Sequence, residues 1–273
     1  MQRIRTGLAM AVPAVFLILF AAPVLLECVL GALILGAAWE WSALAGLSTA
    51  VGRRVYVAVM AAVMALAAIT AGPGRAALEP VLLASGVGWV AAAAAVMAYP
   101  RGTALWGSVA CRALLGLFVL IPPWVALIYL RSVPHGEWLL LFCIALIAFV
   151  DIGAFFAGRR IGGPKLLPAV SPAKTWSGFC GGLLSSMALA VVVAKGVEMP
   201  AEPFRLWLLV CLLTALAGVV GDLLESMLKR HTGIKDSGSL LPGHGGLFDR
   251  LDSLTAGLPV FALGTLMAGG FFA

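Results

Sequence analysis

Charged residues are scarce in this sequence: Asp, Glu, Lys and Arg make up only 11% of its 273 residues. Soluble domains carry about 25% charged residues and about 45–50% apolar ones. Here the hydrophobic fraction is 62% and the mean hydropathy is +1.08, which excludes a soluble domain and predicts an integral membrane protein. The net charge of +6 comes without a basic tail, so we expect no nucleic acid as a partner.

Several common site patterns are also missing. The five cysteines lie in apolar stretches without a CxxC pair, so we expect packed free thiols and neither disulfides nor a zinc site. The sequence has no P-loop (GxxxxGK[ST]) and no evident internal repeat. The N-terminus begins like a signal peptide, but further spans follow at once, so we expect it to be retained as a first helix.

Apolar runs long enough to cross a bilayer fill most of the chain. About 20 apolar residues span the hydrocarbon core, which predicts an all-α, polytopic membrane bundle of about nine transmembrane helices. We expect these helices near residues 7–22, 24–44, 55–72, 80–98, 106–130, 138–158, 178–195, 205–228 and 253–271. Residues 1–100 would hold about four spans and residues 101–273 about five, in one structural domain. Arg112 and Pro122-Pro123 predict a kink or break in the fifth span.

Most of the 18 Lys and Arg residues fall in alternate loops of this layout. Because cytoplasmic loops are enriched in Lys and Arg, the imbalance predicts a cytoplasmic N-terminus. It also places the polar loops 159–177 and 229–252 in the cytoplasm, where nucleotides are. The Ala- and Gly-rich composition suggests a bacterial inner membrane, with bilayer lipid as a partner. The sequence leaves open whether two copies pair as a homodimer.

The acidic residues near the C-terminus are spaced for a shared site. Asp222 and Glu225 lie three residues apart in a predicted helix, so both occupy one face of it. Asp249 and Asp252 have the same spacing at the start of the last predicted helix. Four carboxylates would thus approach one place from two helix ends. Since Mg²⁺ prefers oxygen ligands, this arrangement predicts a metal-assisted phosphate chemistry.

Simpler roles stay open for these acids. Asp249 and Asp252 could cap the last helix, and Asp222 could form an internal salt bridge with Arg112 or Lys174. Glu225 could be solvated near the interface instead of contacting the site.

Three further polar features bear on the site. His244 stands in a Gly-rich turn, PGHGG, where it could contact a phosphate or only hold the turn. Lys174 and Thr175 stand where the seventh span begins, and a helix N-terminus beside a lysine could bind a phosphate. Taken alone, this loop is better explained as a charged connector capped by Ser171. We assign Glu40, between Trp39 and Trp41, to the interfacial aromatic belt.

The polar run SMLKRHTGIKDSGSLLPGHGGLFDRLD at residues 226–252 resembles the signature of the phosphatidate cytidylyltransferase family. The matching positions are a Ser, Lys-Arg, Lys-Asp, Pro-Gly-His-Gly-Gly, Asp-Arg and a final Asp. The segments GDLLES, DIGAFFAGR and SPAKTWSG are similar to the family as well, and so is the placement of AAWEWSALAGL after the first two predicted spans. The resemblance therefore covers most of the chain and is weakest before residue 100. Ser177 departs from the Glu or Gln frequent there and is left out of the site.

The resemblance implies that CTP and phosphatidate react to give CDP-diacylglycerol and pyrophosphate. It implies a Mg²⁺-dependent site with Asp222 and Asp249 as metal ligands, and it leaves a second cation open. The implied catalytic residues are Asp222, Asp249, Lys229, Arg230, His244 and Asp252. The implied substrate-binding residues are Lys174, Thr175, Ser226, Lys235, Asp236, Gly245, Gly246 and Arg250.

Two other functions compete with this hypothesis. A CTP-dependent polyprenol kinase or a related lipid cytidylyltransferase would share the metal and nucleotide chemistry but use another acceptor. An ion-coupled transporter could use Asp151, Asp222 and Glu225 as a cation path. The transporter is disfavoured because the polar cluster lies at one membrane face and no repeated half is evident.

Overall fold

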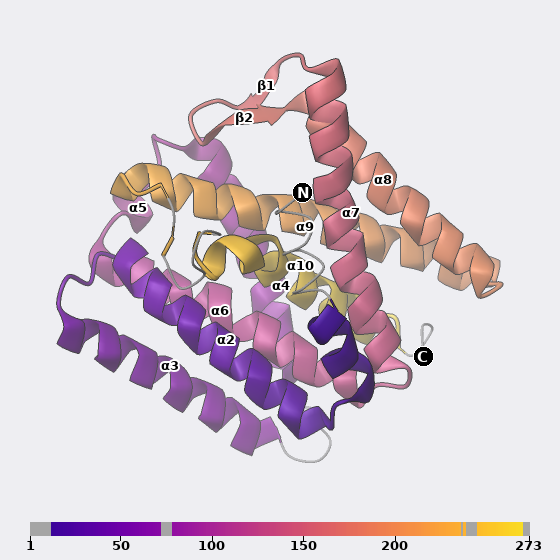
Figure 1. The fold of residues 1–273 in the computed structure, drawn as a ribbon, viewed down its shortest axis with the longest axis horizontal. Coiled ribbons are helices and arrows are strands. Elements are labelled where there is room, and N and C mark those ends of the chain that lie inside the picture. The colour runs from indigo at the N-terminus through magenta and orange to yellow at the C-terminus, as the bar shows by residue number, and fades with distance from the viewer. Residues whose placement is uncertain (1–11, 72–77, 236, 239–244, 270–273) are drawn as a thin grey trace.

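The structure of the protein, a computed structural model, describes residues 12–71, 78–235, 237–238 and 245–269. Helices make up nearly all of this part of the chain (Figure 1). Residues 12–20 are helical and are followed by α2 (Pro23–Leu44), α3 (Ala50–Ala71), α4 (Glu79–Ala98), the short α5 (Thr103–Trp106), α6 (Val109–Ser132), α7 (Gly136–Ile161), α8 (Trp176–Gly196), α9 (Ala201–Thr232) and α10 (Phe248–Met267).

The predicted class, a polytopic membrane protein built from helices, is confirmed. Each predicted span has a helical counterpart, and seven helices of the described chain are long and apolar enough to cross a membrane: α2, α3, α4, α6, α7, α8 and α9. The last predicted helix begins at Phe248 instead of residue 253, so it includes Asp249 and Asp252. The count of nine spans and the cytoplasmic N-terminus stay predictions.

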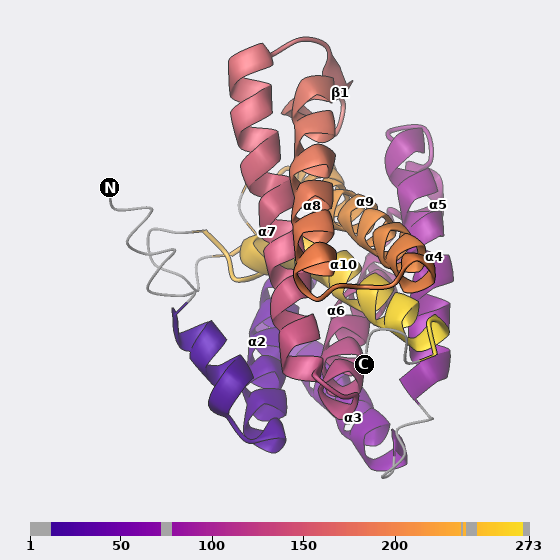
Figure 2. The ribbon, with the colours of Figure 1, turned by 90° about the vertical axis from the view of Figure 1, so that its right-hand side faces the viewer.

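The helix α10 lies inside the bundle, where it packs against α9, α6, α4 and α7. The helices α7 and α8 pack side by side along their length (Figure 2). The helix α9 runs across this pair in Figure 1 and contacts both α8 and α10. The helix α9 thereby connects the α7–α8 pair with α10.

The fifth span is not broken at its prolines, and the alternative of a kink there stays a prediction. The helix α6 continues from Val109 to Ser132 with Pro122 and Pro123 inside it. Both prolines are buried among neighbouring helices. Proline is tolerated in such helices because neighbouring groups satisfy the backbone that it frees.

The all-α prediction missed a small antiparallel hairpin between α7 and α8. Its strands are β1 (Lys165–Leu167) and β2 (Ser171–Thr175), with Lys165 opposite Thr175. Gly162 and Gly163 end α7 with φ values of +65° and +100°, which glycine adopts without steric penalty. The chain can therefore turn sharply after α7 and return along the hairpin to the start of α8.

Small residues let α7 and α8 approach each other closely, as is common between membrane helices. A Cβ at Gly153 of α7 would lie closer than 3.0 Å to Ser185 Oγ and to the Gly181 carbonyl oxygen. The space at Gly153 is therefore filled by the backbone and side chains of α8.

We expect Gly153→Ala to destabilise the α7–α8 pair by about 1–3 kcal/mol, because overpacking forces the backbone apart. Thermal unfolding in detergent measures this as a lowered midpoint. Gly196→Ala is the matched control, since a Cβ there meets nothing within 4 Å. Equal midpoints for the two variants would contradict this packing.

Candidate active site

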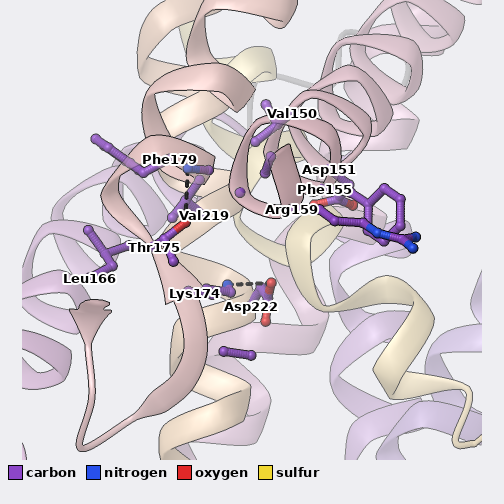
Figure 3. Close-up of a pocket in the computed structure, with 14 residues that line it drawn as sticks. Val150, Asp151, Phe155, Arg159, Leu166, Lys174, Thr175, Phe179, Val219 and Asp222 are labelled. Atoms are coloured by element: carbon purple, nitrogen blue, oxygen red, sulfur yellow. Dashed lines mark hydrogen bonds and ion pairs between the residues drawn. The ribbon is translucent and has the colours of Figure 1, made fainter. Parts of the chain in front are cut away.

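A cavity of about 470 Å³ lies between α7, the hairpin, the start of α8 and α9. Figure 3 shows Lys174 and Asp222 facing each other in it. Lys174 comes from β2 and Asp222 from α9, and Lys174 Nζ donates a hydrogen bond to Asp222 Oδ2. The cavity is also lined by Asp151, Arg159 and several apolar side chains. It therefore offers both signs of charge beside an apolar wall.

The mouth of this cavity is shaped by the cap of α8. Thr175, and not Ser171, is the N-cap, because Thr175 Oγ1 accepts a hydrogen bond of 3.1 Å from Gly178 N. Ser171 instead begins β2. Ser177 Oγ lies 3.0 Å from Thr175 Oγ1 and donates to the Gly162 carbonyl. The hydroxyl of Ser177 thus ties the end of α7 to the start of α8, a role that the sequence did not suggest.

A second charged group lies between α9 and α10, around Lys229. Lys229 Nζ donates a 2.8 Å hydrogen bond to Asp249 Oδ1 and lies 3.4 Å from Glu225 Oε1. Glu225 is 1% exposed, so the prediction that it could be solvated is wrong. A buried carboxylate is costly unless a cation or hydrogen bonds compensate it.

Backbone groups also hold Asp249 in place. Asp249 Oδ2 accepts hydrogen bonds from Gly246 N at 2.8 Å and Ser237 N at 3.1 Å. Gly245, the residue before Gly246, has a φ of +80°, which glycine adopts without steric penalty. Burial opposes the charged form of Asp249, but hydrogen bonds with Glu225, Lys229 and Gly246 outweigh it and hold the pKa of Asp249 well below its usual range.

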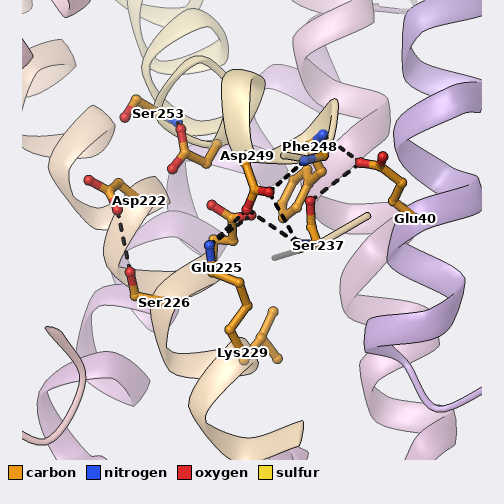
Figure 4. A network of polar contacts seen from close by, with 12 residues as sticks. Glu40, Asp222, Glu225, Ser226, Lys229, Ser237, Phe248, Asp249 and Ser253 are labelled. Atoms are coloured by element: carbon orange, nitrogen blue, oxygen red, sulfur yellow. Dashed lines mark hydrogen bonds and ion pairs between the residues drawn. The ribbon is translucent and has the colours of Figure 1, made fainter. Parts of the chain in front are cut away.

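Asp252 links the two charged groups. Its side chain lies close enough to Glu225 and to Asp222 to interact with both. Burial, followed by the Asp222 charge, raises the pKa of Asp252 to about 7. The spacing of the four acids therefore did predict that the ends of α9 and α10 meet (Figure 4).

The other predicted site residues are spread around this centre. Ser226 Oγ donates to Asp222 Oδ1 at 3.4 Å, and Arg230 Nε donates to the Val170 carbonyl at 3.4 Å. Arg230 thus braces the hairpin against α9. Lys235 and Arg250 are exposed. Asp236, predicted to bind substrate, and His244, predicted to act in catalysis, lie outside the described residues.

Glu40 corrects the sequence-based assignment. It is not an interfacial residue but is 2% exposed, and its carboxylate accepts hydrogen bonds from Phe248 N and Ser237 Oγ. Figure 4 shows it reaching from α2 toward the segment that holds Asp249. The sequence did contain a signal for this role of Glu40, because an ionisable residue inside a membrane helix is energetically costly and usually functional.

The acidic side chains of the site carry oxygen ligands of the kind that a divalent cation prefers. In the described chain, ion pairs join Asp222, Glu225 and Asp249 to only two lysines, Lys174 and Lys229, and Asp252 adds a fourth carboxylate. No three Asp, Glu, His or Cys side chains of the described residues already form a metal-binding group. The ammonium groups of Lys174 and Lys229 contact the carboxylate oxygens that a hard cation would use as ligands.

The sequence matches one known protein family over nearly its whole length. Residues 1–267 match the model of the Cytidylyltransferase family. The chain belongs to the Cytidylyltransferase family. It is 41% identical over 234 residues to a phosphatidate cytidylyltransferase of Pseudomonas aeruginosa, covering 85% of this chain and 84% of that protein. A phosphatidate cytidylyltransferase of Haemophilus influenzae is 32% identical to this chain, and the matched region covers 96% of each protein.

The family match extends the sequence-based resemblance toward the N-terminus. The motifs that suggested a cytidylyltransferase all lie after residue 100, apart from the segment around Glu40. The family model nevertheless begins at residue 1. This agrees with the structure, in which α2 contributes Glu40 to the same polar network.

We expect Thr175→Val to cost about 1 kcal/mol of stability, because it removes the N-cap acceptor of α8. Thr175→Ser keeps that oxygen and is the matched control. Equilibrium unfolding in detergent would show a lower midpoint for the Val variant only. Equal losses in both variants would show that the hydroxyl does not cap the helix.

Proposed function

We propose that this member of the Cytidylyltransferase family transfers the cytidylyl group of CTP to phosphatidate. The products would be CDP-diacylglycerol and pyrophosphate. The observation that carries this proposal is the pair of Lys–Asp contacts, Lys174–Asp222 and Lys229–Asp249, on adjoining parts of α9. The names of the relatives from Pseudomonas aeruginosa and Haemophilus influenzae support the same substrates.

The reaction needs charge neutralisation and positioning more than covalent help from the protein. A phosphate oxygen of the lipid attacks the α-phosphorus of CTP, and the bond between that phosphorus and the bridging oxygen of pyrophosphate breaks in line. The attacking oxygen is already anionic near pH 7, so no strong general base is required. Lys174 and Lys229 would bind phosphate oxygens as they exchange their carboxylate partners for substrate.

Asp222 and Asp249 would hold Mg²⁺ when the site is loaded, with Glu225 and Asp252 beside them. A bound divalent cation would neutralise charge on the nucleotide phosphates. The backbone N–H groups of Ser237 and Gly246 orient Asp249 for that role. Lys174 and Lys229 form ion pairs with these carboxylates, which compensates their charge.

The cavity beside Lys174 suits a substrate with a charged head and an apolar body. Its walls combine Asp222, Lys174 and Arg159 with apolar side chains such as Phe155 and Phe179. The acyl chains could stay in the bilayer while the phosphate reaches the lysine. With the proposed cytoplasmic N-terminus in a bacterial inner membrane, this site faces the compartment that holds CTP.

We expect Asp222→Asn and Asp249→Asn each to lower turnover by on the order of 100-fold or more, the scale of losing one electrostatic contact to a transition state. The assay supplies purified protein in detergent with labelled CTP, phosphatidate and Mg²⁺, and measures CDP-lipid and pyrophosphate. Glu202→Gln is the matched control, because its side chain is 84% exposed and lies at the far end of α9.

Near-normal turnover in both Asn variants would contradict the assignment of these acids. Turnover with a polyprenol and none with phosphatidate would support the related kinase instead. Solute flux without consumption of CTP would favour the transporter.

A further inference from the structure

The carboxylate of Glu40 contacts both segments that hold Asp249, although Glu40 lies some 200 residues earlier in the chain. Its Oε2 accepts a 2.8 Å hydrogen bond from Phe248 N and a 3.3 Å hydrogen bond from Ser237 Oγ. Phe248 begins α10, and Ser237 lies just beyond α9. A single oxygen therefore joins Ser237 to Phe248, the residue before Asp249.

The same two segments bind Asp249. The backbone N–H of Ser237 donates to Asp249 Oδ2 at 3.1 Å, while its hydroxyl donates to Glu40. Gly246 N donates to Asp249 Oδ2 at 2.8 Å, and Phe248 is the residue before Asp249. Any shift of the Glu40 carboxylate is thus passed to the groups that orient Asp249.

Two glycines, Gly238 and Gly246, lie against Glu40. A Cβ at Gly246 would lie 2.7 Å from Glu40 Oε2, and a Cβ at Gly238 would meet Glu40 Oε1 closer than 3.0 Å. Such approaches are closer than real Cβ atoms tolerate. The backbone at Gly238 and Gly246 therefore leaves room for this carboxylate that a larger residue would fill.

The helix α2 itself is fixed at this position. The neighbouring Trp41 is fully buried, and its ring packs edge-on against Phe248 with centroids 5.0 Å apart. Trp41 Nε1 also donates to the Arg112 carbonyl of α6 at 2.8 Å. A negative charge at the N-terminus of α10 is favourable as well. The backbone of Glu40 is therefore held in place by packing, and its carboxylate is attracted to the N–H groups at the start of α10.

We propose that Glu40 is a positioning residue that acts through Asp249: it sets the place of the Asp249 carboxylate without touching substrate. For turnover this inference rests on the proposed function, but its effect on cation binding can be measured separately. Residues that orient a metal ligand typically contribute about 10–100-fold to metal affinity or activity.

The test compares Glu40→Gln with the wild-type protein in detergent. Gln fills the same volume but lacks the charge that faces Phe248 N and Ser237 Oγ. We expect the Kd for Mn²⁺, measured by electron paramagnetic resonance, to rise by about 10-fold or more. We expect kcat to fall with KM for CTP changing less, while the thermal unfolding midpoint measured without cation stays near that of the wild type.

Two further variants keep the test decisive. Ser237→Ala removes the hydroxyl that donates to Glu40, so it should weaken Mn²⁺ binding in the same direction but less. Glu202→Gln makes the same chemical change at an exposed position and should leave Mn²⁺ binding and turnover unchanged.

The proposal is overturned if Glu40→Gln and Ser237→Ala bind Mn²⁺ as the wild type does, or if the wild type binds no Mn²⁺. It is also overturned if Glu40→Gln only lowers the unfolding midpoint, since that would be a purely structural role. Failure of the wild type to convert CTP and phosphatidate would instead refute the proposed function, and the Mn²⁺ titration would still test Glu40.

Discussion

The structure depends on the close contact between α9 and α10, where four carboxylates meet inside a largely apolar bundle. Gly221 makes this contact close, because a Cβ there would lie closer than 3.0 Å to the Asp252 carbonyl oxygen. Charges in such surroundings are stable only when paired or hydrogen-bonded. Lys229, Lys174 and the backbone N–H groups before α10 supply those partners.

This constraint explains the form of the site. The hairpin carries Lys174 over α9, and Arg230 braces it through the Val170 carbonyl. The cap of α8 by Thr175 fixes the end of β2 that bears Lys174. On the other side, α2 reaches Phe248 and Ser237 through Glu40. The N-terminal helices are therefore part of the polar centre, in agreement with a family match that begins at residue 1.

The sequence predicted those features that depend on local spacing. Apolar runs located the helices. Two pairs of acids, each spaced three residues apart, predicted that Asp222 and Glu225 would meet Asp249 and Asp252. It did not reveal features that depend on the neighbours of a residue. Pro122 and Pro123 left a break in α6 open, because propensity cannot show that surrounding helices stabilise this helix. Glu40 was misassigned because its partners, Ser237 and Phe248, lie far along the chain.

The most direct test of the central claim is an experimental structure with CTP and Mn²⁺ bound, with the cation located by its anomalous scattering. The account predicts a peak within coordination distance of both Asp222 and Asp249, with Lys174 and Lys229 turned from these carboxylates to phosphate oxygens. A cation bound elsewhere, with both lysine–aspartate contacts intact beside the nucleotide, would contradict it.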